Sequence, residues 1–446
     1  MSSLRDRPAA KDRADLEEIG MKRRKGLKDN DLAQTYPMLS VEQARDRVLA
    51  GLIPLEPESV PIISALGRVL AENVKAGYDI PPHANTAMDG YAMKAGDTAD
   101  ASESNPVWLE VIGELAAGYV CQQEVTPGTA IRIMTGAPIP QGADSIVRFE
   151  RVEVDGNRIQ ITRPVPTGDE IRSAGEDVKK GDLVLSRGTR LRPQDIGMLA
   201  SLGVTDVAVT KRPQVGILAT GDELVGIDKP LAPGKIRNSN SYSTAAQVVR
   251  YGGEPLLLGI ASDNKEQITD KIHESVRQGI DLLIVSGGVS VGDFDVVKTV
   301  LAAQGAIDFW QVRMKPGKPL AFGHIIAGKK QIPVLGTPGN PVSTMISFEL
   351  FARPILLALL GASDTEHPTI RAKLADPISY KDDRRHFLRV KLEKAEDGYV
   401  AHLTGDQGSG ILMSMVQADG LAIIPETCSS VDRGMDVEVI LLGDAL

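Results

Sequence analysis

Apolar residues recur along this chain with two spacings, and the change from one to the other divides it into regions. Between residues 213 and 361, short apolar runs such as QVGILAT and DLLIVSGG alternate with amphipathic stretches such as KEQITDKIHESVRQG. Strands that alternate with helices of about 10–15 residues are typical of crossover units and a mostly parallel sheet. The pattern predicts an α/β domain that ends in a long apolar helix over 342–361, where Pro354 should produce a kink.

The residues before this domain have a different pattern of apolar and polar positions. Ser40-Val41-Glu42-Gln43 has the form of a capping box, and the helical spacing that follows predicts a helix, so order should begin at Met38. A second short helix is predicted over 62–74. Residues 107–162 contain short β-type runs separated by turn residues, which indicates a small β-rich domain.

Two further regions flank the α/β pattern. Residues 180–211 combine the β-like LVLSRGTRL with a short helix in QDIGMLASLG, which indicates a connector. From residue 363 onward the runs FLRVKLEKAEDGYVAHL and GLAIIP are again of β type. A small β-barrel or sandwich is predicted there.

Composition narrows the classes of function. The chain has 446 residues, of which 42% are hydrophobic and 24% charged, as is ordinary for a soluble globular protein of roughly three domains. A net charge of −9 and an aromatic content of 4% argue against a nucleic-acid-binding protein, which would need a basic surface or base-stacking side chains. Any anion that the protein binds must therefore be held by local groups.

Cysteine content and the N-terminal residues bear on the compartment. Cys121 and Cys428 fit neither a disulfide framework nor a metal-ligand spacing, so a reducing, cytoplasmic compartment is expected. Residues 1–37 contain no apolar run suited to a signal peptide or a membrane span. We expect a flexible N-terminal extension and no membrane partner.

Three apolar strands of the α/β region end in loops of special composition: TGDEL, SGGVSVGDFD and TPGNP. In an open parallel sheet, ligands bind outside the carboxyl ends of the strands, so these loops should meet at one edge. The glycines of SGGVSVGDFD can present backbone N–H groups to an anion, and Ser286 and Ser290 add hydroxyl donors. A tight turn without a ligand would explain the glycines alone, but Asp293 and Asp295 beside them favour a Mg²⁺–phosphate site.

The other loops allow two interpretations each. The two prolines make TPGNP stiff, which suits either a preorganised ligand cradle or a rigid connector. One carboxylate of TGDEL could cap a turn while the other holds a metal. Lys315 and Lys318 in KPGKP could bind phosphate as point charges or form a solvated basic turn.

The β-rich half has a dense polar patch of its own. The segment HANTAMDGYA (83–92), the run RIMTGAP (132–138), Arg172 and Gly175-Glu176-Asp177 are rich in hydrogen-bonding side chains. Taken singly, each is more typical of loop structure than of catalysis. None fits a Ser-His-Asp triad, a Cys-His pair or a zinc cluster.

Together these segments resemble the MoeA family, the molybdopterin molybdenumtransferases to which the E domain of gephyrin also belongs. The resemblance runs from about Met38 to the C-terminus. It is carried, in the family's order, by HANTAMDGYA, RIMTGAPIP, IRSAGED, TGDEL, SGGVSVGDFD, MKPGKP and TPGNPVS.

The resemblance implies an elongated homodimer whose chain has four domains after the extension. Their expected limits are 38–80 with 176–211 for the discontinuous, elongated domain I and 81–175 for the β-rich domain II. They are 212–361 for the three-layer α/β molybdopterin-binding domain III and 362–446 for the C-terminal β-barrel domain IV. The MDGYA and MTGAP loops are expected to complete the cleft of the partner subunit.

The resemblance also implies the reaction, in which adenylylated molybdopterin and molybdate give molybdenum cofactor and AMP with Mg²⁺. The residues expected in catalysis are Asp89, Thr135, Arg172, Asp177, Glu223, Asp263, Asp295 and Lys315. Those expected to bind substrate are Ser286, Gly287, Gly288, Ser290, Lys318, Pro338, Gly339, Asn340, Pro341 and Ser409. Glu223, Asp263 and Asp295 are expected to hold the metal.

The resemblance leaves alternatives. The family often has a basic residue where this chain has Gln311, so the chain departs from the family at a position that could grip an anion. A molybdopterin adenylyltransferase and a gephyrin-like scaffold or binding protein are the competing functions. The upstream adenylyltransferase and the recipient molybdoenzymes are the further partners that the resemblance allows.

Overall fold

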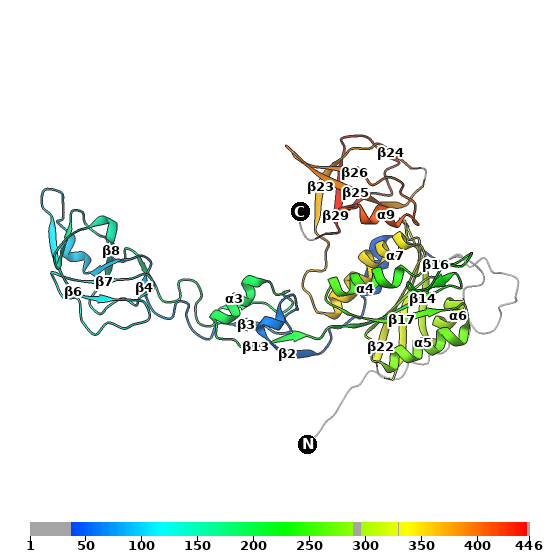
Figure 1. Cartoon of the computed structure of the whole chain (residues 1–446), viewed down its shortest axis with the longest axis horizontal. Helices are drawn as coiled ribbons and strands as arrows, with labels where there is room; N and C mark the ends of the chain where they lie inside the picture. Colours follow the sequence, from blue (N-terminus) through cyan, green and yellow to red (C-terminus); the bar gives the residue numbers. More distant parts are fainter. Residues whose placement is uncertain (1–36, 289–295, 329, 381, 444–446) are drawn as a thin grey trace, which may run out of the picture.

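The computed structural model of the chain describes residues 37–288, 296–328, 330–380 and 382–443. Figure 1 shows an elongated molecule, with an α/β domain and a barrel domain together at one end and a β-rich insertion domain at the other. A small linker domain connects the two ends. The predicted multidomain class of α/β and β units is confirmed, whereas residues 1–36 of the predicted extension lie outside the described residues.

The α/β domain is built on a seven-stranded sheet of order β1-β19-β21-β22-β18-β14-β17. Its strands are β1 (Met38–Leu39), β14 (Gln214–Thr220), β17 (Glu254–Ala261), β18 (Leu282–Ser286), β19 (Gly305–Val312), β21 (Pro319–Ala327) and β22 (Lys330–Thr337). As predicted, β22, β18, β14 and β17 are parallel neighbours. Alternate residues of β14 point to opposite faces: Val215 and Ile217 join one hydrophobic core and Leu218 joins the other.

Helices cover both faces of this sheet, which makes three layers. The first core includes residues of α2 (Val41–Leu49), α4 (Asn240–Arg250), α7 (Pro341–Ser347) and α8 (Arg353–Leu359); the second includes residues of α5 (Lys265–Arg277) and α6 (Val296–Gln304). The capping box predicted at Ser40 is present. Helix α5 is capped by Asn264, whose side chain accepts from the N–H of Gln267, so Asp263 is not used as a cap.

The long apolar helix is continuous but irregular. A π-helical turn, η4 (Phe348–Ala352), separates α7 from α8. Pro354 lies in the first turn of α8 and has no N–H to donate, so the regular hydrogen-bond pattern changes just before it. By length and composition the run Pro341–Leu359 could cross a membrane, but 89% of its apolar window is buried inside the protein, as in a core helix.

The linker domain joins segments that are far apart in sequence. Strand β2 (Pro57–Pro61) pairs with β13 (Asp206–Thr210), and β3 (Val74–Lys75) pairs with β12 (Leu183–Leu185). Helix α3 (Pro193–Ser201) lies where a short helix was predicted.

The prediction of a helix over 62–74 is wrong, because only a 3₁₀ turn, η1 (Ile62–Ala65), forms there. Gly67 follows with φ of +73°, and Leu70 then bridges to Val209. The apolar spacing reflects burial of Ala65 and Leu70 in the linker core, not helical periodicity.

The insertion domain has a six-stranded sheet of order β8-β5-β7-β6-β10-β9. Its strands are β5 (Gly90–Met93), β6 (Val107–Leu115), β7 (Thr129–Ile133), β8 (Ser145–Arg148), β9 (Glu153–Asp155) and β10 (Arg158–Ile161), with 3₁₀ turns η2 (Ala95–Thr98) and η3 (Phe149–Arg151). A separate pair, β4 (Asn85–Thr86) with β11 (Ile171–Arg172), lies where this domain meets the linker (Figure 1). The predicted β-rich domain is confirmed.

The barrel domain closes through the pairing of β25 with β27. It contains β23 (Thr369–Leu374), β25 (Arg385–Ala395), β26 (Gly398–Leu403), β27 (Gly420–Ile424), β29 (Asp436–Leu441), the short pair β24 (Ile378–Ser379) with β28 (Ser430–Val431), and helix α9 (Leu412–Val416). A two-residue strand from the α/β domain, β20 (Met314–Lys315), pairs with β25 and extends this sheet.

Candidate active site

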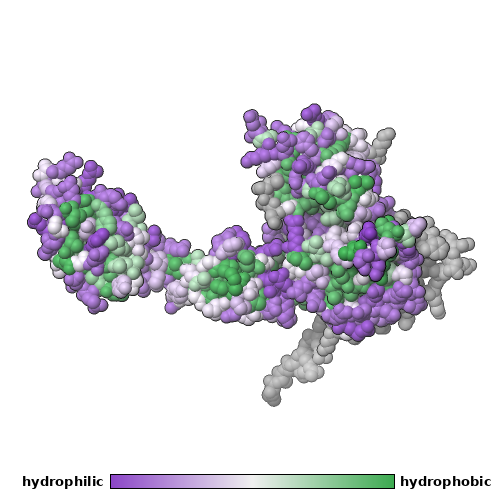
Figure 2. All heavy atoms as spheres, viewed as in Figure 1, coloured by the Kyte–Doolittle hydropathy of each residue, from purple (hydrophilic) through white to green (hydrophobic). Residues whose placement is uncertain are grey.

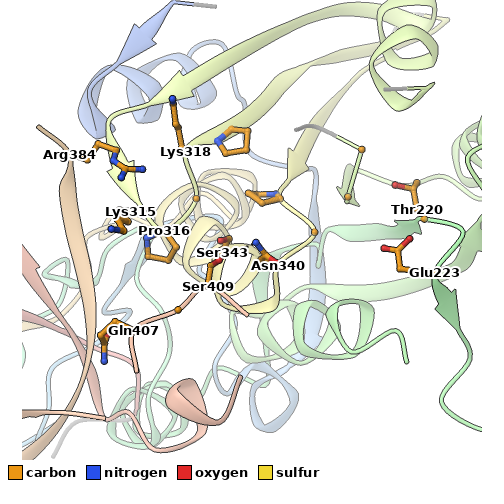
Figure 3. Close-up of a pocket in the computed structure, with 18 of the residues that line it drawn as sticks. Thr220, Glu223, Lys315, Pro316, Lys318, Asn340, Ser343, Arg384, Gln407 and Ser409 are labelled. Atoms are coloured by element: carbon orange, nitrogen blue, oxygen red, sulfur yellow. Dashed lines mark hydrogen bonds between the residues drawn. The ribbon is translucent and has the colours of Figure 1, made fainter. Parts of the chain in front are cut away.

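A cleft of about 730 Å³ lies between the carboxyl edge of the α/β sheet and the barrel domain (Figure 3). It is lined by Thr220, Gly221, Glu223, Asp263, Gly287, Gly288, Lys315, Pro316, Gly317, Lys318, Pro319, Pro338, Gly339, Asn340, Ser343, Arg384, Gln407, Gly408 and Ser409. The three loops predicted to meet at one edge of the sheet therefore do meet, and the KPGKP turn joins them.

Two of these loops pack backbone against backbone. Gly287 follows β18 with φ of +92°, and its N–H donates to the Thr337 carbonyl at 3.0 Å. A Cβ on Gly287 would lie 2.6 Å from the carbonyl oxygen of Thr220, so a larger residue does not fit. A Cβ on Gly339 would lie 3.7 Å from the Cα of Gly287. The floor of the cleft is thus formed by peptide groups held in fixed positions.

Carboxylates gather on one side of the cleft. The N–H of Asp263 donates to the Asp222 side chain at 3.2 Å, and Glu223 lies on the neighbouring loop between β14 and β15 (Leu224–Val225), which pairs with β16 (Ile236–Arg237). Burial, followed by the negative charges of Asp222 and Glu223, raises the pKa of Asp263 above its ordinary value. Such a group of carboxylates favours a cation beside it.

Cations gather on the opposite side. Figure 3 shows Lys315, Lys318 and Arg384 across the cleft from Glu223. Gly317 lies between the two lysines with φ of +99°, so the KPGKP turn has a backbone conformation that favours glycine. Arg384 comes from the barrel domain, just before β25.

The barrel also contacts the start of α7. The Nδ2 group of Asn340 donates to the Ser409 hydroxyl at 3.0 Å, and the N–H of Val342 donates to the Ser409 carbonyl at 3.1 Å. From the other side, Asn240 donates to the Gly339 carbonyl at 2.8 Å. The TPGNP loop is therefore held from both domains.

Ten of the predicted site residues line the cleft: Glu223, Asp263, Gly287, Gly288, Lys315, Lys318, Pro338, Gly339, Asn340 and Ser409. Ser286 is buried at the end of β18, and Pro341 begins α7; neither lines the cleft. Ser290, Asp293 and Asp295 lie outside the described residues.

The residues predicted from the insertion domain lie elsewhere. The carboxylate of Asp89 accepts hydrogen bonds of 2.7 Å from both the N–H and the hydroxyl of Thr135, and these bonds hold the pKa of Asp89 below its ordinary value. Arg172 is exposed in β11, and Asp177 is exposed beyond it. Their domain is at the far end of the molecule (Figure 1), so one chain does not bring them to the cleft.

Several lining residues were not predicted, among them Thr220, Ser343, Arg384 and Gln407. Gln407 adjoins Ser409 in the segment QGS, which is a usable signal, whereas Arg384 stands in a charged run without any motif. Gln311 lies on β19, where its N–H donates to the Pro37 carbonyl, and it does not line the cleft.

Two of the three carboxylates that were predicted to hold a metal lie in the cleft. Within the part of the chain that the structure describes, no group of three or more His, Cys, Asp or Glu residues is arranged to hold a metal ion. Glu223 and Asp263 supply two oxygen-donor side chains in the cleft, and the third expected carboxylate, Asp295, is outside the described residues. The two carboxylates fit a hard divalent cation, which prefers oxygen ligands.

Comparison with known proteins covers nearly the whole chain. The descriptions "MoeA N-terminal region (domain I and II)", "Probable molybdopterin binding domain" and "MoeA C-terminal region (domain IV)" match residues 39–203, 216–358 and 371–442. The molybdopterin molybdenumtransferase of Bacillus subtilis is 36% identical over 410 residues, which cover 91% of this chain and 94% of that protein. The enzyme of the same name from Haemophilus influenzae is 34% identical, with 90% and 98% covered.

A solved structure is similar to this chain over the same range of domains. The molybdopterin biosynthesis moeA protein from Pyrococcus horikoshii superposes with a TM-score of 0.79 at 35% identity, covering 91% of this chain and 100% of that one. The similarity thus extends over all the domains that build the cleft and over the distant insertion domain. The chain belongs to the MoeA family.

Proposed function

We propose that this protein is a molybdopterin molybdenumtransferase, which uses molybdate and adenylylated molybdopterin to form molybdenum cofactor and release AMP. The names of its relatives support this activity. The observation that carries the proposal is the charge pattern of the cleft, in which Glu223 and Asp263 oppose Lys315, Lys318 and Arg384. A cleft of about 730 Å³ has the size of a site for a nucleotide-like ligand, not for a lone phosphate.

The cationic side suits the two anions of this reaction. Lysine ammonium groups bind phosphate and oxyanions as point charges, and an arginine guanidinium adds directed hydrogen bonds. The backbone at Gly287 and Gly288 can approach a phosphate closely because no side chain intervenes. The proposed reaction needs little covalent participation by side chains, so substrate positioning and electrostatic stabilisation account for most of the catalysis.

The acidic side suits Mg²⁺. We propose that Glu223 and Asp263, with Asp295 as the third carboxylate, hold this ion. Mg²⁺ bound there would offset phosphate charge and polarise the phosphoanhydride. The raised pKa of Asp263 supports the assignment, because a cation would relieve the repulsion among these carboxylates.

The insertion domain requires a second chain. We propose a homodimer in which Asp89, Thr135, Arg172 and Asp177 complete the cleft of the partner subunit. Figure 2 shows apolar surface over the linker domain, where Ile63, Leu66 and Leu183 are 73%, 48% and 52% exposed. Exposed apolar side chains in one area are typical of an interface between proteins.

The domain limits given above and a cytoplasmic location belong to the same proposal. The pairing of β2 with β13 and of β3 with β12 supports a discontinuous domain that joins residues 57–75 to residues 183–210, whereas β1 and α2 pack in the α/β domain, so the limit of 38 for domain I is too early. The upstream adenylyltransferase and the recipient molybdoenzymes are proposed as further partners.

The test is a reaction with purified protein, adenylylated molybdopterin and Mg²⁺, with and without molybdate. We expect AMP release that depends on molybdate, together with formation of cofactor that activates an apo-molybdoenzyme. If AMP release is absent or does not respond to molybdate, the metal-transfer function is excluded and a scaffold role takes its place.

A further inference from the structure

The cationic side of the cleft crosses a seam between two domains. Strand β20 of the α/β domain pairs in parallel with β25 of the barrel, with Lys315 opposite His386. The N–H of Arg385 donates to the Arg313 carbonyl at 3.0 Å across the same seam. Lys315 and Arg384 line the same cleft but belong to different domains, so their relative position depends on this seam.

One carboxylate outside the cleft lining joins the two cations. Asp382 accepts a hydrogen bond of 2.7 Å from the guanidinium of Arg384 and lies 3.7 Å from the ammonium of Lys315. Its other oxygen is 2.8 Å from Nε2 of His386. The hydrogen bond from Arg384 lowers the pKa of Asp382 far below its ordinary value, against a smaller effect of burial, so the carboxylate remains ionised.

The histidine that contacts Asp382 is itself fixed in the barrel. His386 is 2% exposed, and its ring stacks on Tyr380 with a centroid distance of 3.6 Å. The ammonium of Lys315 lies 5.7 Å from the centroid of the same tyrosine ring. Because an ionised carboxylate only accepts hydrogen bonds, Nε2 of His386 is the donor and its position determines where Asp382 lies.

We propose that Asp382 is a positioning residue, which holds Lys315 and Arg384 side by side so that both can bind one oxyanion. The identity of that anion as molybdate rests on the proposed function; the positioning does not. Two cations on one wall repel each other, and a shared carboxylate behind them offsets the repulsion and fixes both side chains.

The negative charge of Asp382 and its positioning role predict opposite effects on anion affinity when Asp382 is removed. Asp382 is negative, so its removal would strengthen anion binding if net charge alone mattered. If Asp382 positions the cations, its removal weakens anion binding even though the cleft becomes more positive. The sign of the change therefore separates the two explanations.

The experiment compares Asp382→Asn with Asp383→Asn in the full-length protein. Asp383 carries the same charge one residue away, but it is 81% exposed on its side chain, pairs with Arg313 at 3.8 Å and does not line the cleft. Titration calorimetry with molybdate alone, and separately with inorganic phosphate, measures affinity. We expect Asp382→Asn to bind about fivefold more weakly and Asp383→Asn to change by less than roughly twofold. Unchanged or tighter binding by Asp382→Asn would overturn the proposal.

A conservative variant and kinetics extend the test. Asp382→Glu keeps a carboxylate within reach of Arg384 and should recover at least half of the lost affinity. Asp382→Ser, which also removes the charge, replaces Asp382→Asn as the test variant if the latter does not fold. In the AMP-release assay, Asp382→Asn should raise KM for molybdate and leave kcat within about twofold. A fall in kcat at unchanged KM would contradict a positioning role. If anion binding follows the prediction but no molybdate-dependent AMP release occurs, the positioning stands and the proposed function fails.

Discussion

The cleft and the Asp89 loop contain similar residue types but are built differently. In the cleft, Gly287 packs against the Thr220 backbone, and contacts from two domains hold the TPGNP loop. At the far end of the molecule, Asp89 and Thr135 bond to each other while both remain exposed to solvent. One region is a preformed cavity, and the other is a pair of exposed side chains held together by hydrogen bonds.

This difference has a physical origin in the surrounding secondary structure. Parallel strands end at a common edge, so their loops converge and enclose space. In the insertion domain, β5 and β7 are antiparallel neighbours, and the residues that follow β7 and precede β5, among them Thr135 and Asp89, are exposed at one end of this pair. A ligand held by Asp89 must therefore be covered from outside the domain, which agrees with the proposed homodimer.

The largest predicted effect tests whether the close approach of Gly287 to the Thr220 backbone excludes any side chain at position 287. Gly287→Ala places a Cβ 2.6 Å from the Thr220 carbonyl oxygen at a φ of +92°, and should lower the free energy of unfolding of the α/β domain by about 3 kcal/mol. Gly136→Ala is the matched control in the insertion domain: φ is +84°, but nothing lies within 4 Å of the new Cβ. There we expect a loss of about 1 kcal/mol, from backbone conformation alone.

The two tryptophans allow the domains to be followed separately. Trp310 belongs to the α/β core and Trp108 to β6 of the insertion domain. In a Trp108→Phe background only Trp310 remains, so its fluorescence follows denaturant unfolding of the α/β domain with and without Gly287→Ala. In a Trp310→Phe background only Trp108 remains, and it follows the insertion domain with and without Gly136→Ala. Equal losses at Gly287 and Gly136 would refute the crowding argument.

The next effect concerns the acidic side of the cleft. Glu223→Gln keeps the shape of the side chain but removes its charge, and should slow AMP release at least about tenfold, roughly 1.4 kcal/mol of barrier. Glu254→Gln is the control, because Glu254 begins β17 at the opposite edge of the same sheet. Wild-type rates in Glu223→Gln would remove this residue from the mechanism, and an equal slowing in Glu254→Gln would indicate a general effect of lost charge.

How much of this could be predicted from the sequence differs between the two sides of the cleft. Gly287, Gly339 and Glu223 follow apolar strands directly, so local pattern and the edge rule together place them. Arg384 could not be placed in this way, because it reaches the cleft through the pairing of β20 with β25, a contact between segments some 70 residues apart. Pairings of that range leave no periodic signal in the sequence.

The failed helix over 62–74 has a related cause. The apolar positions of IISALGRVL are spaced as in a helix, but Gly67 takes a positive φ and Leu70 pairs with distant Val209. Tertiary pairing overrode a local pattern. The Asp89 loop was identified as polar, and only the resemblance, not a feature of its residues, led to the expectation that it completes the cleft of another subunit.

A mixing experiment tests that assignment. Asp89→Ala and Glu223→Gln should each be at least about tenfold slower than wild type, since each damages one half of the site. After subunit exchange between the two variants, about half of the dimers are mixed and each has one site with both residues intact, so about a quarter of wild-type AMP release should return. If exchange is verified by differently tagged chains and no activity returns, Asp89 does not act on the partner's cleft.

The smallest predicted effect follows from the opposite pKa shifts of two aspartates. Burial and the charges of Asp222 and Glu223 raise the pKa of Asp263, so ionisation of this group opposes folding: its contribution to stability is present below 3.8 and is lost as pH rises through the folded-state pKa. Asp263→Asn should therefore stabilise the α/β domain at neutral pH by at most about 0.5 kcal/mol, since water screens the exposed carboxylate, and should not do so at pH values below 3.8.

Asp89 should behave in the opposite way. Hydrogen bonds from Thr135 lower its pKa, so its contribution to stability is present above 3.8 and is lost as pH falls through the folded-state pKa. Asp89→Asn should destabilise the insertion domain at neutral pH, with a smaller difference from wild type in acid. The same tryptophan reporters measure both variants across pH. If Asp263→Asn destabilises the protein at neutral pH, a favourable contact of this carboxylate outweighs its repulsion by Asp222 and Glu223. The carboxylates of Asp263 and Asp89 would then both stabilise the folded state, and the predicted difference between the two regions would be wrong.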